Sequence, residues 1–153
     1  MSTTSTQSTA AATGTSTGFA RIAGILAIIA GVVLIAAGAT TWTMVRGQLI
    51  EENITVAEDA AMFGGERVDG PLDAYFQADI INQHALESSG GLTYAELDRE
   101  DPVRATVMNG SFLRASLFTS VVSFGIAAMA MGLGVVFGLI GIALRTIGKS
   151  ATV

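Results

Sequence analysis

The chain has 153 residues, of which 50% are hydrophobic and only 14% are charged, too few charges for the surface of an ordinary soluble domain. It contains no cysteine, which excludes disulfides and thiolate metal sites. Its net charge is −5 and it has no basic cluster to neutralise phosphates, which argues against a nucleic-acid-binding surface.

The N-terminal segment, residues 1–20, is rich in serine and threonine and begins without apolar periodicity. Such a segment cannot bury enough apolar surface to offset the entropy lost on ordering. We predict that this segment is a disordered tail in the cytoplasm.

Two charge-free runs follow, at residues 22–45 and 115–144. Helices of about 24 and 30 residues rise about 36 and 45 Å, against a hydrocarbon core of about 30 Å. Both runs are therefore predicted to be transmembrane helices. Trp42 suits the headgroup region near the end of the first run, and basic residues close both runs: Arg46 for the first, Arg145 and Lys149 for the second.

A signal peptide is the alternative for the first run. Ala37-Gly38-Ala39 has the form of a signal-peptidase site after an apolar stretch of about 15 residues. The apolar run continues through Val45, however, and little positive charge precedes it. These two features favour a retained span.

All thirteen acidic residues lie between Glu51 and Asp101, and residues 46–114 carry a net charge of −8. We predict a helical loop at 46–111, with its longest helix within 71–89, between a Gly-Pro start and a Gly-Gly stop. Residues 55–58 and 93–96 have capping-box spacing, and Asp101-Pro102 is a helix start. The predicted fold is an all-α membrane protein, a hairpin of two transmembrane helices with a small helical extracytoplasmic loop domain.

Topology depends on basic residues near the span ends, and these are evenly divided between the two sides. The loop is long, which weakens its influence, and its acidic excess suits an extracytoplasmic segment. We therefore predict a multi-pass protein of the plasma membrane, with the N-terminal tail and a short tail at 145–153 both in the cytoplasm. The basic residues compared are Arg21, Arg145 and Lys149 for the tails, and Arg46, Arg104 and Arg114 for the loop.

Small residues recur at helical spacing in both predicted spans. Such residues let helix backbones approach closely where lipid removes the hydrophobic driving force, although glycine is also simply common in membrane helices. The alignment on one face of each span favours packing between helices. The predicted packing residues are Ala23, Ala27 and Gly31 in the first span, and Ala130, Gly134 and Gly138 in the second.

A weak metal or proton site could be built around His84, the single histidine, with Asp79 and Glu87 nearby in sequence. A solvated helix face explains these residues better. A Cys-His pair is impossible, a Ser-His-Asp triad would depend wholly on His84, and neither span contains an ionisable residue. We therefore predict no catalytic residue, no cofactor and no metal.

Three stretches carry a family resemblance: RGQLIEENITVAEDA, DGPLDAYFQADIINQHAL and GLTYAELDREDPVRATVMNGSFLRASLFTSVVSFGIAAMAMGLGV. Over residues 45–144 the chain resembles a family of short actinobacterial membrane proteins. The resemblance implies a two-span protein and brings no site residues. Many members carry the name "aromatic ring-opening dioxygenase LigA", but an extradiol iron site needs two histidines and a carboxylate, and this chain has one histidine.

The sequence thus favours a non-enzymatic membrane protein, an accessory or assembly subunit of a larger envelope complex. Its expected partners are the lipid bilayer and another membrane protein or a second copy of itself. The alternative is a membrane-anchored module that binds a small ligand or cation through the acidic loop around Asp79, His84 and Glu87.

Overall fold

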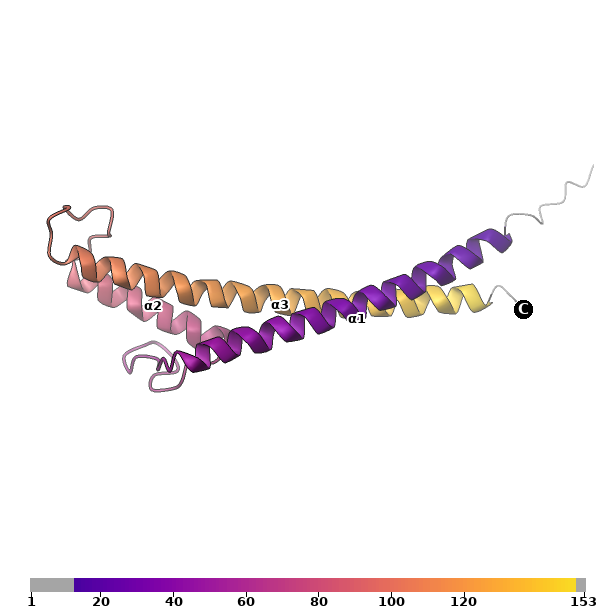
Figure 1. Ribbon diagram of the computed structural model, residues 1–153, viewed down its shortest axis with the longest axis horizontal. Coiled ribbons are helices and arrows are strands. Elements are labelled where there is room, and N and C mark those ends of the chain that lie inside the picture. The colour runs from indigo at the N-terminus through magenta and orange to yellow at the C-terminus, as the bar shows by residue number, and fades with distance from the viewer. Residues whose placement is uncertain (1–12, 151–153) are drawn as a thin grey trace, which may run out of the picture. The chain divides into compact units, whose positions relative to one another are not determined.

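The computed structural model describes residues 13–150, with side chains from 18 to 148. This part of the chain is all-α, with α1 at Thr13–Glu51, α2 at Pro71–Ser88 and α3 at Arg104–Ser150 (Figure 1). It divides into two compact units. The helix-pair unit joins α1 up to Ala37 to α3 from Ala130, and the three-helix unit is Gly38–Met129.

Both long helices extend beyond the predicted spans. α1 begins at Thr13, so residues 13–20 are helical, and the prediction of disorder is wrong there; residues 1–12 lie outside the described part of the chain. Once an apolar segment has formed a helix, each added residue gains a hydrogen bond without a new nucleation step, so the helix continues past the apolar run. Likewise, parts of the predicted loop and C-terminal tail, at 46–51, 104–111 and 145–150, are helix.

Two helices are long and apolar enough to cross a membrane, over Gly18–Glu51 and Arg104–Gly148. Only 17% of the most apolar window of each helix is buried. A core helix of a soluble protein would be mostly buried. By length and composition, these helices fit a membrane hairpin.

In the helix-pair unit, α1 and α3 touch through glycines spaced seven residues apart. A Cβ added to Gly31 would lie 2.6 Å from the carbonyl oxygen of Gly134, and one added to Gly24 would lie 2.7 Å from that of Gly141. We call these four buried residues the glycine seam. Because a repeat of seven residues keeps one face of an α-helix toward its partner, the backbones stay in contact over two turns of each helix.

The six predicted packing residues lie in or beside this seam. Gly31 and Gly134 face each other, whereas a Cβ added to Gly138 would meet no atom within 4 Å. Gly24 and Gly141, which the prediction did not include, make the second contact. Three predicted residues are half-buried at the edges of the seam: Ala23, Ala27 and Ala130.

The three-helix unit has a continuous apolar core. Trp42 of α1 packs edge-to-face on Phe124 of α3, with ring centroids 4.7 Å apart. α2 lies alongside the first part of α3 (Figure 1), where the ring of Tyr75 meets that of Phe118 at 5.9 Å. The buried members of this core are Leu49, Val56, Val68, Ala74, Ala78, Leu117 and Phe124.

The connection between α1 and α2 contains no helix: residues 58–59 form only a turn, and the capping-box spacing at 55–58 does not open a helix. Thr55 instead forms an isolated antiparallel bridge with Arg67. Val56 donates its amide to Glu66, and Val68 donates to Ile54, at 2.8 and 2.9 Å. Both valines are almost fully buried, so their burial in the core overrides the local helix signal.

The other predicted boundaries correspond to real capping contacts. α2 fills residues 71–88 of the predicted 71–89 and ends before Gly90 and Gly91, whose φ angles are +66° and +90°. The Asp101 carboxylate accepts a hydrogen bond from the amide of Val103, at 2.8 Å, just before α3. At the second capping box, Thr93 donates its amide and hydroxyl to Glu96, but residues 93–96 form a single turn and no helix.

Candidate functional site

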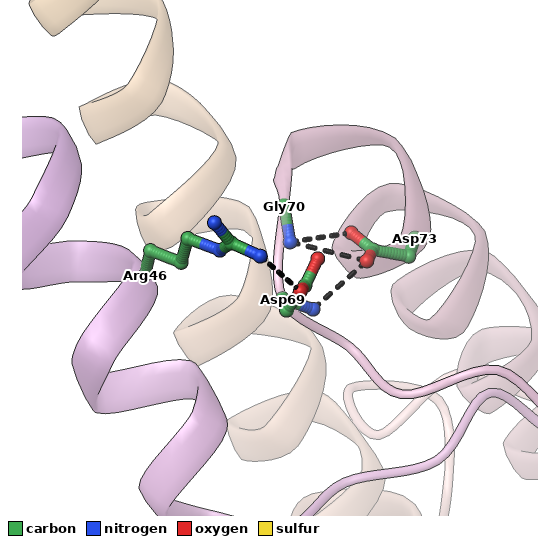
Figure 2. Close-up of polar contacts among 4 residues, drawn as sticks. All are labelled: Arg46, Asp69, Gly70 and Asp73. Atoms are coloured by element: carbon green, nitrogen blue, oxygen red, sulfur yellow. Dashed lines mark hydrogen bonds and ion pairs between the residues drawn. The ribbon is translucent and has the colours of Figure 1, made fainter.

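Hydrogen bonds that involve two aspartates and one arginine fix the start of α2. The Asp73 carboxylate accepts hydrogen bonds from the amides of Asp69, at 2.8 Å, and Gly70, at 2.9 Å. The Asp69 carboxylate in turn accepts one from the Arg46 guanidinium of α1, at 2.6 Å (Figure 2). Both ends of this ion pair are about half exposed, so it sets the direction of the chain more than it stabilises the fold.

Asp73→Ala is expected to lower the free energy of unfolding by about 0.5–2 kcal/mol, the usual loss for a helix cap. The reason is that the amides of Asp69 and Gly70 would lose their acceptor. Thermal unfolding of the full chain in detergent measures the effect. Asp79→Ala is the control, because that carboxylate accepts a bond from Gln83 within the same helix. Equal losses in the two variants would contradict the capping role.

His84 has a different partner from those predicted. Its Nε2 lies 2.7 Å from the Asp59 carboxylate, in the connection between α1 and α2, whereas Asp79 bonds to Gln83. Among the described residues, no group of three or more histidine or acidic side chains is arranged to hold a metal ion. The contact instead ties the 52–70 connection to α2.

This contact lowers the pKa of Asp59 below its ordinary value, chiefly through the hydrogen bond from His84. A carboxyl group whose pKa is depressed in the folded state stabilises the fold above its unfolded pKa of about 3.9, and the contribution is lost as the pH falls through the folded pKa. Asp59→Asn should therefore melt at a lower temperature than the wild type at pH 6, and the difference should shrink as the pH falls through the lowered pKa of Asp59. Asp98→Asn, at an exposed carboxylate, is the control. A difference that persists unchanged at low pH would contradict the assignment.

Arg104 orders the connection between α2 and α3. Its guanidinium lies 4.0 Å from the centre of the Tyr94 ring and donates to the backbone carbonyls of Tyr94 and Leu97. In the same connection, the hydrogen bonds from Thr93 lower the pKa of Glu96. Sequence reasoning treated Arg104 only as a topology signal, because nothing local shows which carbonyls a side chain will reach.

The three-helix unit carries shallow clefts of about 170–320 Å³. These volumes reach only the lower end of the usual range for ligand pockets, about 300–1,000 Å³. Comparison of the chain with known proteins finds no matching family model, no similar curated protein and no similar solved structure.

Proposed function

We propose that the chain is a two-span integral membrane protein of the plasma membrane and a non-enzymatic accessory or assembly subunit of a larger envelope complex. The observation that carries this proposal is the exposed apolar surface of two long helices whose backbones meet in the glycine seam. Glycines form the contact between the two helices, and the large apolar side chains lie on the helix faces that point away from this contact. In water that surface would be prohibitively exposed, whereas lipid or a partner helix would cover it.

The three-helix unit supports a contact role because it presents rigid side chains. α2 is held by the Asp73 cap and by the Tyr75–Phe118 contact, and Leu72 and Tyr75 remain 63% and 44% exposed. Exposed aromatic side chains on a fixed helix are suited to anchoring a protein partner. Phe76, the neighbouring aromatic residue of α2, instead packs against Phe63, with ring centroids 5.6 Å apart.

The alternative, a cation-binding module, gains no support from the geometry. Asp79, His84 and Glu87 lie on one helix, but the imidazole is already bonded to Asp59. We therefore keep the role in protein contact as the proposed function. Its test includes a measurement of cation binding.

Purification of the tagged full-length protein in a mild detergent discriminates between the two roles. A stoichiometric co-purifying membrane protein, cross-linked to Tyr75 or Leu72 through an introduced photoreactive residue, supports the accessory role. A protein that purifies without a partner, and whose melting temperature rises with Ca²⁺, Mg²⁺ or Zn²⁺, contradicts it and supports the cation-binding role.

The proposed topology has both termini in the cytoplasm, residues 46–111 outside and the first span retained. Because the chain has no cysteine, single-cysteine variants have no background in labelling. In intact cells, an impermeant maleimide should label Glu87→Cys, and should label Ser5→Cys and Ala151→Cys only after lysis. The opposite pattern would reverse the topology. Loss of an N-terminal tag from the mature protein would show that the first span is a cleaved signal peptide.

A further inference from the structure

A cleft of about 280 Å³ lies between α2, residues 93–95 and α3 in the three-helix unit. Ser111 and Arg114 line this cleft and also an adjoining one of about 170 Å³, whose other walls are Ala115 and Phe118. The two clefts thus meet at Arg114. The position is notable because Arg114 directly precedes the charge-free run of residues 115–144.

The chemistry changes from one end of this pair of clefts to the other. Ala115 and Phe118 make one end apolar, and the Arg114 guanidinium lies 5.3 Å from the centre of the Phe118 ring. Within the described residues, Arg114 makes no ion pair with an acidic side chain. At the other end the walls include the amide of Asn82 and Thr93, which is bonded to the Glu96 carboxylate.

We propose that these clefts bind the headgroup of a membrane glycerophospholipid, with its phosphodiester on Arg114. This inference rests on the proposed membrane location, which puts Arg114 at headgroup depth. The guanidinium matches a phosphate in charge and in the geometry of its donors, and the Asn82 amide lines the same cleft as a donor for the rest of the headgroup. The acyl chain would follow Phe118 toward the bilayer, and the negative charge of Glu96 favours a headgroup that carries an ammonium group.

Native mass spectrometry and thermal unfolding of the delipidated full-length protein, with added phosphatidylethanolamine or phosphatidylglycerol, test this proposal. The wild type should retain one lipid and melt at a higher temperature with phosphatidylethanolamine than with phosphatidylglycerol. Arg114→Gln should weaken lipid retention about tenfold or more, the usual effect of losing a charged hydrogen bond. Arg114→Lys keeps the positive charge but lacks the paired N–H donors of arginine. Its lipid retention should therefore lie between that of the wild type and that of Arg114→Gln.

Arg67→Gln, at an exposed arginine in the bridge of the α1–α2 connection, is the matched control and should bind lipid as the wild type does. Equal retention by Arg114→Gln and Arg67→Gln, or a stronger effect of phosphatidylglycerol, would overturn the proposal. So would an equal stabilisation by inorganic phosphate alone, which would assign the site to a soluble anion. Membrane fractionation of the same variants separates the two inferences, because a chain absent from the membrane contradicts the proposed function itself.

Discussion

Alanine at Gly31 or Gly134 is expected to destabilise the helix pair, although alanine is the better helix former. The added Cβ would lie 2.6 Å from a backbone carbonyl oxygen of the opposite helix in either variant. No side-chain rotation relieves a clash between backbones, so the helices must separate. Overpacking of this kind typically lowers the free energy of unfolding by about 1–3 kcal/mol. Unfolding of the full-length protein by SDS titration in mixed micelles measures the change.

Gly125→Ala and Gly132→Ala are the matched controls on α3. A Cβ at either position meets no atom within 4 Å, so these variants should be neutral or more stable by up to about 1 kcal/mol. Gly138→Ala should behave like the controls, although Gly138 belongs to the predicted packing set. A loss of stability shared by seam and control variants would mean that the seam does not hold the helices together.

Sequence alone predicts well those elements that are determined by residues close together in the chain. Absence of charge over a long run is a property of the run itself, so both long helices could be predicted. The same holds for α2, where Pro71 opens the helix and Gly90 and Gly91, both at positive φ, follow its end. The Asp101 contact at the start of α3 is also local, because the carboxylate reaches only two residues along the chain.

The features that sequence could not predict depend on residues far apart in the chain. Asp59 and His84 are separated by 25 positions, and Arg46 and Asp69 by 23. Helical spacing relates only neighbours three to five residues apart, so it groups His84 with Asp79 and Glu87 and misses Asp59. The glycine seam shows the same limit in part: a Cβ added to Gly31 meets the backbones of Gly134 and Gly138, but a four-residue spacing does not lead to Gly24 and Gly141, which lie seven residues away on each helix.

The acidic excess of the loop takes on a different meaning in the structure. Among the described residues, at least five of the acidic side chains make structural contacts, as a cap, an ion pair or a turn partner. Acids engaged in this way are poorly placed to gather around a cation. The residues concerned are Asp59, Asp69, Asp73, Glu96 and Asp101.

Phe124→Ala is expected to have the largest effect on the three-helix unit. Phe124 is 1% exposed and packs edge-to-face on Trp42. Removal of the ring leaves a cavity and deletes the aromatic contact, and such truncations lower the free energy of unfolding by about 3–5 kcal/mol. Trp42 is the only tryptophan, so its fluorescence reports directly on this contact. The emission should change in the folded variant, and the unfolding midpoint should fall.

Phe112→Ala on the same helix is the matched control, because that ring is 67% exposed. Its removal should change stability by less than about 0.5 kcal/mol and leave the Trp42 emission unaltered. Similar losses in the two variants, or an unchanged Trp42 spectrum in Phe124→Ala, would contradict the packing of these two rings. A large loss of stability in Phe124→Ala alone would show that this aromatic pair fixes the C-terminal part of α1 to α3. Once α1 and α3 are fixed in this way, they can hold α2 in one position.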